Sequence, residues 1–178
     1  MIPMHRFSLA IAGMCAVPAQ AGEVFAGAYV HEVDTPFTLY TGESGADAEL
    51  GYRFDPIEQL GAIGKPSPYV IASLNTGGGT SFAGVGLSWK IGKGPVYVRP
   101  GVGLVVHDGP SERIDPFTGR HTELGSRVLF EPEIAVGTQV TERVAIEVSW
   151  VHISQGRIFN AQQNPGIDMI GVRFNWRL

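Results

Sequence analysis

The feature that most constrains this chain is the alternation of apolar with polar or small residues along several long segments. Within the segment 95–107, even positions carry Val96, Val98, Pro100, Val102, Leu104 and Val106, and odd positions carry Tyr97, Arg99, Gly101 and Gly103. Successive side chains of a strand point to opposite faces, so this pattern predicts a strand with one apolar face. Helical periodicity of similar strength is found nowhere in the sequence.

Eight segments alternate in this way, and together they account for most of the chain. They lie near 22–33, 47–55, 68–75, 80–91, 95–107, 124–140, 143–154 and 166–178. A soluble β-sandwich would turn the apolar faces inward, whereas a membrane barrel turns them outward to lipid and keeps a polar lumen. The sandwich remains the alternative to the barrel at this point.

Three observations favour the barrel. The faces opposite the apolar stripes combine glycine with charged residues such as Arg99, Glu131 and Arg173. Trp89, Trp150 and Trp176 lie near segment ends, as membrane-interface aromatics do. The last alternating segment also runs to the C-terminus. We therefore predict an all-β, eight-stranded antiparallel transmembrane β-barrel over 22–178, with a lumen filled by side chains rather than a pore.

The N-terminus has the features of a secretory signal peptide. Arg6 precedes the short apolar stretch 7–17, and Ala19-Gln20-Ala21 fits a cleavage site, so we predict a signal peptide at 1–21. Removing it would also remove Cys15, and an exported chain without cysteine is not a disulfide-stapled domain. The formal net charge of −4 gives no sign of nucleic-acid binding, so no nucleic-acid partner is expected.

The connections indicate an orientation. If both termini are periplasmic, the outer loops are roughly 34–46, 76–79, 108–123 and 155–165, and the periplasmic turns are roughly 56–67, 92–94 and 141–142. Outer loops of such barrels are usually longer than periplasmic turns. This orientation predicts a site in the outer leaflet for polar residues at the outer ends of the last two strands.

Three such polar residues continue the apolar faces of those strands. His152 and Ser154 share the parity of Ile146 and Val148, and Asp168 begins the next strand with the parity of its apolar face. Polar groups on an apolar face are costly unless they have a function. A serine nucleophile needs a base, and a histidine base needs an acid that fixes its tautomer. Asn164, Gln155 and Gly156 are nearby candidates to stabilise an oxyanion.

The same residues carry a family resemblance. Residues 145–156, AIEVSWVHISQG, followed by Asn164-Pro165-Gly166-Ile167-Asp168, resemble the C-terminal signature of the outer-membrane lipid A 3-O-deacylases, the PagL family. The resemblance implies a barrel enzyme that hydrolyses the ester-linked 3-hydroxyacyl chain at position 3 of lipid A. It implies His152 as base, Ser154 as nucleophile, Asp168 as acid and Asn164 as an oxyanion donor.

Two positions depart from the family pattern, which has glutamate where this chain has Asp168 and asparagine where it has Gln155. The resemblance implies no cofactor and no metal, a lipid A or lipopolysaccharide substrate, and contact with lipid of a Gram-negative outer membrane. The sequence leaves homodimer formation open. The alternatives are a non-catalytic structural or adhesive barrel, and a barrel phospholipase or acyltransferase with the same triad.

Overall fold

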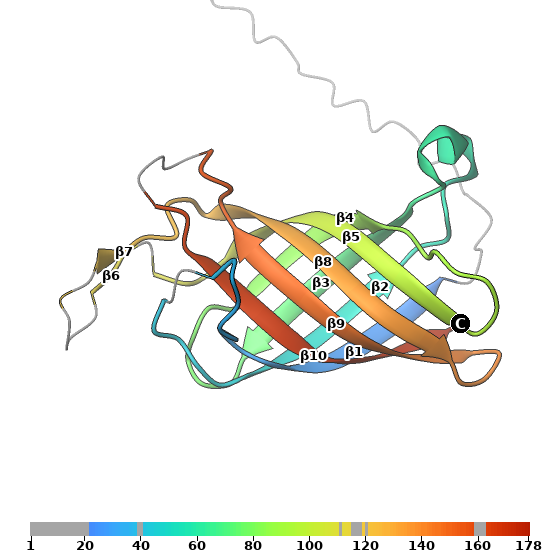
Figure 1. Ribbon diagram of the computed structural model, residues 1–178, viewed down its shortest axis with the longest axis horizontal. Coiled ribbons are helices and arrows are strands. Elements are labelled where there is room, and N and C mark those ends of the chain that lie inside the picture. Colours follow the sequence, from blue (N-terminus) through green and yellow to red (C-terminus); the bar gives the residue numbers. More distant parts are fainter. Residues whose placement is uncertain (1–21, 39–40, 111, 115–118, 120, 159–162) are drawn as a thin grey trace, which may run out of the picture.

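The computed structural model is a closed antiparallel barrel, and it describes residues 22–38, 41–110, 112–114, 119, 121–158 and 163–178 (Figure 1). The predicted signal peptide lies outside the described residues. The barrel strands, in spatial order, are β1 (Glu23–Val30), β10 (Gly166–Arg177), β9 (Val144–Ser154), β8 (Val128–Gln139), β5 (Val96–His107), β4 (Phe82–Ser88), β3 (Ser67–Asn75) and β2 (Ala46–Arg53). The prediction of an eight-stranded barrel is confirmed.

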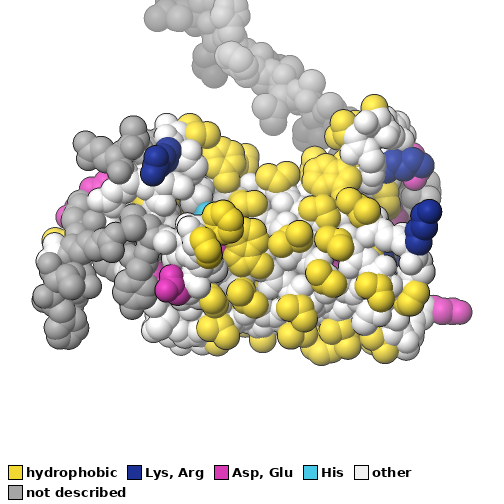
Figure 2. Space-filling model, in the orientation of Figure 1, with side chains coloured by type: hydrophobic (Ala, Val, Ile, Leu, Met, Phe, Trp, Pro, Cys, Tyr) yellow, Lys and Arg dark blue, Asp and Glu magenta, His cyan; other side chains and the backbone are white. Residues whose placement is uncertain are grey.

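The apolar faces of the strands point outward. Leu104, Val136, Val148 and Phe174 are all exposed on the outer surface. Figure 2 shows hydrophobic side chains spread over the body of the barrel, with the charged ones gathered towards its two ends. A closed barrel leaves no unpaired strand edge in lipid, and its apolar outer band faces the acyl chains. This combination is typical of an outer-membrane protein. The sandwich alternative, with these residues in a core, is wrong.

The lumen holds a buried network of arginines, glutamates and tyrosines. Arg173 Nε donates to Glu49 Oε1 at 2.7 Å, and Arg173 Nη2 donates to Glu133 Oε2 at 2.7 Å. Arg99 Nε donates to Glu147 Oε1 at 2.8 Å. All of these side chains are buried. Buried charges persist only when they are paired and hydrogen-bonded, and here each arginine joins carboxylates from other strands across the narrow lumen.

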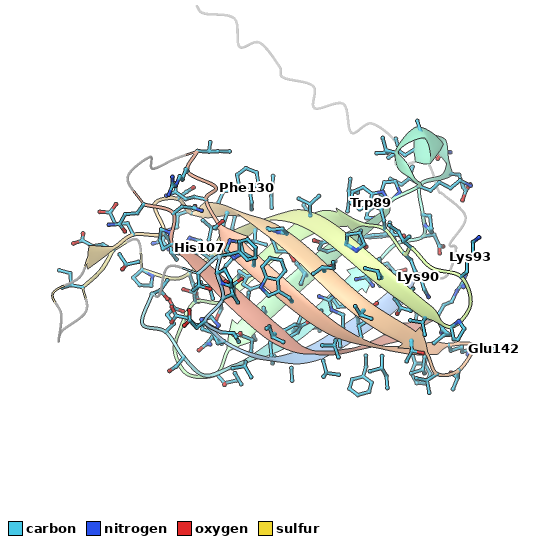
Figure 3. The ribbon with its side chains drawn as sticks, viewed as in Figure 1. Trp89, Lys90, Lys93, His107, Phe130 and Glu142 are labelled. Carbon is cyan, nitrogen blue, oxygen red and sulfur yellow. The ribbon has the colours of Figure 1, made fainter. Side chains whose placement is uncertain are left out.

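The two ends of the barrel differ. One end, called the loop end here, carries the segments that follow β1, β3, β5 and β9, including the small hairpin of β6 (Arg113–Ile114) and β7 (His121–Thr122). The other end carries the C-terminus and the 3₁₀ helix η1 (Glu58–Ile63) (Figure 1). Figure 3 places His107 and Phe130 towards the loop end, and Lys90, Lys93 and Glu142 towards the opposite end.

Several strands are shorter than the alternation predicted, most of all those of the segments 80–91 and 124–140. The segment 80–91 forms a strand only over Phe82–Ser88, followed by an isolated bridge from Ile91 to Val98. The segment 124–140 begins its strand at Val128, because Leu124 turns into the core and is 5% exposed. Neither η1 nor the β6–β7 hairpin was predicted. Within the described part of the chain, no helix is long and apolar enough to cross a membrane.

Candidate active site

The three polar residues selected from the sequence lie close together on the β9–β10 ladder, on two residue pairs separated by the pair Ile153–Ile167. Asp168 is directly opposite His152, and Gly166 is directly opposite Ser154. Their parity points outward, yet Asp168 is 0% exposed, Ser154 5% and His152 8%. Other side chains must therefore cover them. The site is thus on the outer wall of the barrel at the loop end, but shielded from the surroundings.

The acid and the base are in direct contact. His152 Nδ1 lies 2.9 Å from Asp168 Oδ1. The same oxygen accepts Trp150 Nε1–H at 2.7 Å, and Oδ2 accepts the hydroxyl of Thr35 at 2.8 Å and that of Thr38. With the proton on Nδ1 facing the carboxylate, the lone pair of Nε2 is available to accept a proton.

Gly166 leaves room for the imidazole ring. A methyl group added to Gly166 would overlap His152 Cε1 and lie 2.9 Å from Nε2. Gly166 is the ladder partner of Ser154, and the ring nitrogen nearer to this position is Nε2, at 2.9 Å against 3.2 Å for Nδ1. No hydrogen bond between His152 and Ser154 is present among the described residues. Catalytic contacts of this kind are often loose before substrate binds.

The third strand at the site is β8, which pairs with β9 on the side away from Asp168. Phe130 pairs with Ser154 and Glu133 pairs with Val151, so the register places Pro132 opposite His152. Proline has no N–H to give to the ladder. The pairing is therefore interrupted beside the base, in a strand that is otherwise continuous.

Two aromatic rings flank the base and the acid. Trp150 lies two residues before His152 on the same face of β9, and their rings stack with centroids 5.8 Å apart at 29°. Phe37 packs on the other side of Trp150, with centroids 5.8 Å apart. Trp150 was predicted only as a membrane-interface aromatic, so its contacts with His152 and Asp168 are a finding of the structure.

The proposed oxyanion residues lie where the chain leaves β9. Residues 155–158 form a tight turn with left-handed backbone at Gly156 and Arg157, at φ 64° and 61°. Ile158 N donates to Gln155 O at 3.2 Å. Gln155 Nε2 donates to the carbonyl of Gln163 at 2.8 Å, so the buried Gln155 amide ties the two ends of this loop together.

Among the described residues, the Asn164 side chain makes a hydrogen bond through its oxygen only. Its Oδ1 accepts Arg157 N–H at 3.2 Å, which leaves Nδ2 to donate elsewhere. Residues 159–162 of this loop lie outside the described part of the chain. Within the described part, Asn164 and Gly156 are the better candidate donors, because the Gln155 amide already holds the loop.

A second buried histidine lies at the loop end, on the lumen side. His31 is one residue beyond β1, and its Nδ1 lies 2.8 Å from Asp47 Oδ2 while Nε2 lies 2.8 Å from Glu43 Oε2. Burial by itself would lower the pKa of His31, but the hydrogen bonds to Asp47 and Glu43 raise it to about 9. Nothing in the sequence pointed to this cluster. Among the described residues, no group of three or more His, Cys, Asp or Glu is arranged to hold a metal ion.

Comparison with known proteins bears on this arrangement. The family model described as lipid A 3-O-deacylase (PagL) matches residues 36–177. The chain belongs to this family. Among curated proteins, no relative matches the sequence.

Three solved structures share the fold of this PagL-family chain. The outer-membrane enzyme PagL is 17% identical, covers 88% of this chain and 99% of its own, and has a TM-score of 0.61. Neisserial surface protein A is 12% identical, with coverage of 90% and 100% and a TM-score of 0.53. The N-terminal barrel domain of Pseudomonas aeruginosa OprF is 10% identical, with coverage of 88% and 100% and a TM-score of 0.52. At these identities the likeness extends to the fold alone.

Proposed function

We propose that this PagL-family chain is a serine esterase of the outer membrane that removes the 3-hydroxyacyl chain from position 3 of lipid A. The observation that carries the proposal is the 2.9 Å contact between His152 and Asp168 on the outer wall, two residues along β9 from Ser154. The lumen network already accounts for the buried charges that hold the barrel together. A purely structural barrel has no need for a second set of polar residues on its lipid face.

In the first half of the reaction, Ser154 Oγ attacks the ester carbonyl carbon as His152 Nε2 takes its proton. The carbonyl oxygen becomes an oxyanion, and its proposed donors are the Gly156 N–H and Asn164 Nδ2. Asp168 keeps the imidazolium in its orientation and stabilises its charge. When the tetrahedral intermediate collapses, the ester C–O bond breaks and His152 gives its proton to the sugar hydroxyl that leaves.

In the second half, water replaces the sugar. His152 takes a proton from the water, whose oxygen attacks the acyl-serine carbonyl. The intermediate collapses, the proton returns to Ser154 Oγ, and a 3-hydroxy fatty acid is released. Each step uses the same base and the same oxyanion donors, so no cofactor is needed.

The membrane brings the ester to the site. With both termini periplasmic, the loop end faces outside and the site lies in the outer leaflet. The exposed apolar side chains around it, including Phe37 at 68% and Ile170 at 39%, would contact acyl chains. A lipid held in this leaflet has its ester groups between the sugar and the chains, and we expect Ser154, the last residue of β9 at the loop end, to meet them there.

The test is mass spectrometry of lipid A after incubation with the full-length protein folded in detergent or vesicles. The wild type should reduce the mass by one 3-hydroxyacyl group. Ser154→Ala and His152→Ala should each lower the rate by several orders of magnitude while the barrel still folds. Ser149→Ala is the matched control, because Ser149 is on the same strand but faces the lumen and contacts Tyr29. It should retain activity.

Unchanged lipid A with folded wild-type protein would contradict the proposal and favour the structural or adhesive barrel. Release of fatty acid from phospholipid vesicles, but not from lipid A, would instead assign the site to the phospholipase class. Equal loss in Ser149→Ala and Ser154→Ala would show that the effect is one of folding.

A further inference from the structure

The Asp168 carboxylate is held by more donors than the base requires. One oxygen accepts from His152 and Trp150, both on β9, and the other accepts from Thr35 and Thr38, in the segment that follows β1. The seam between β1 and β10 brings this segment, residues 33–38, alongside Asp168. Its Val33 N–H also donates to the Asp168 carbonyl at 2.8 Å.

The segment is built so that the two threonine hydroxyls point at the carboxylate. Phe37 N–H donates to Thr35 Oγ1 at 3.1 Å, and Thr35 N–H donates to Thr38 Oγ1 at 3.2 Å. Each hydroxyl oxygen thus accepts a backbone N–H and keeps its own hydrogen for another acceptor. The carboxylate is the strongest acceptor within reach, because it is charged. The segment therefore offers Asp168 two preoriented donors.

We propose that Thr35, Thr38 and Trp150 are positioning residues that fix the Asp168 carboxylate beside His152; this inference rests on the function proposed above. None of the three donors is charged, so the carboxylate keeps its full charge for the imidazolium. They leave it one orientation in which Oδ1 faces Nδ1. The first loop of the barrel, far from Ser154 in sequence, is thereby part of what orients the catalytic base.

Removing these donors should change the pH dependence of the rate, which would not happen if they only stabilised the fold. A carboxylate with fewer hydrogen bonds has the same net charge, but the anion is less well stabilised and therefore attracts the imidazolium more strongly. The base then loses its proton only at higher pH. The acid limb of the rate profile should move to higher pH, and kcat should fall because the ring is less well oriented. KM should stay the same, because none of the three groups contacts the ester.

The experiment compares Thr35→Val/Thr38→Val, and separately Trp150→Phe, with the wild type. The first variant keeps the shape of the side chains, and the second keeps an aromatic ring at position 150. Both remove donors, and each should lower kcat roughly tenfold, with the acid limb moved to higher pH and KM unchanged. Thr35→Ser/Thr38→Ser keeps both hydroxyls and should restore the wild-type profile. Thr80→Val is the control, because Thr80 Oγ1 also donates to a buried carboxylate, that of Glu43 at 2.7 Å, away from the site.

A second measurement does not depend on catalysis. The His152 imidazole, labelled with ¹⁵N and assigned by comparison with His152→Gln, is titrated by NMR in the same detergent. Its midpoint should move to higher pH in both variants and stay in place in Thr80→Val. If wild-type protein leaves lipid A intact but this shift is seen, the proposed function fails and the positioning role stands. Unchanged midpoints and rate profiles in both variants would overturn the inference.

Discussion

Two regions of this barrel bury carboxylates, and they satisfy them in opposite ways. In the lumen, Glu49, Glu133 and Glu147 are paired with Arg173 or Arg99. On the outer wall, Asp168 is equally buried, yet among the described residues its donors are two hydroxyls, an indole and an imidazole. In these three lumen pairs a fixed cation neutralises the acid, whereas the site surrounds its acid with neutral donors.

This difference separates holding a fold from preparing a reaction. An arginine beside a carboxylate cancels its charge permanently, which suits a network that only links strands. Neutral donors stabilise the anion without cancelling it, so its charge remains available when the neighbouring imidazole takes up a proton. Changing the acid should therefore abolish chemistry at the outer wall, while changing an arginine in the lumen should reduce stability.

The largest expected effect is that of Asp168→Asn on activity. The NH₂ group of the new amide would face groups that are themselves donors, so hydrogen bonds would be lost. The change would also remove the charge that stabilises the imidazolium. We expect kcat to fall by about 10⁴-fold, as it does when a serine-hydrolase triad loses this charge. The kcat of Asp168→Glu should lie between those of the wild type and Asp168→Asn, because the longer side chain cannot keep all four donors of a site shaped around aspartate. The measurement is the rate of lipid A deacylation by folded protein.

The expected order of activity is thus Asp above Glu above Asn. Full activity in Asp168→Asn would remove this carboxylate from the machinery and leave the catalytic proposal on His152 and Ser154 alone. An active Asp168→Glu equal to the wild type would show that the two threonines do not select for the shorter side chain.

The matching change in the lumen is Arg173→Met. It leaves Glu49 and Glu133 buried without their cation, and breaking a buried pair in this way typically costs about 3–5 kcal/mol of folding free energy. We expect a lower denaturant midpoint in detergent but near-normal deacylation by the protein that remains folded. Arg177→Met, at an exposed position on the same strand, should change the midpoint little. An Arg173→Met barrel as stable as the wild type would contradict the contrast between lumen and outer wall.

The third effect concerns the space beside the base. In Gly166→Ala the added methyl would overlap the imidazole, and the ring would have to move by roughly 1 Å. A misplacement of that size can lower a rate by about 10²-fold. Gly61→Ala is the control, because a methyl there would meet nothing within 4 Å. The result would be read from kcat, with a thermal melt showing that both variants fold equally well. An unimpaired Gly166→Ala would mean that the ring can shift without loss.

The features that could be predicted from the sequence are those set by local alternation, and the contacts between residues far apart in the chain could not be predicted. Strand alternation predicted the barrel and its outward faces, because a period of two fixes which side each residue points to. The same parity brought His152, Ser154 and Asp168 to one face. The partners supplied by a loop were not predictable: Thr35 and Thr38 are more than 120 residues from Asp168, and nothing in their own segment marks them. Gly166 acts through the absence of a side chain, which no pattern reveals.

The smallest expected effect is on the pH dependence of stability, and it distinguishes His31, which contacts carboxylates, from His107, which does not. His31 is held between Asp47 and Glu43 in the lumen, and its pKa in the folded protein is raised to about 9 from an ordinary value near 6.5. A group whose folded pKa is raised adds stability that is complete below the ordinary value and is lost as pH rises through the raised one. The denaturant midpoint should therefore be constant at acidic pH and fall between about 6.5 and 9.

His31→Gln should flatten this dependence. His107→Gln should leave it intact, because His107 Nε2 contacts a backbone carbonyl, that of Ser126 at 2.7 Å, rather than a carboxylate. If the denaturant midpoint of His31→Gln still falls over this pH range, the titrating group is not His31. The contrast between the charged surroundings of His31 and the neutral donors around Asp168 would then not be visible in stability.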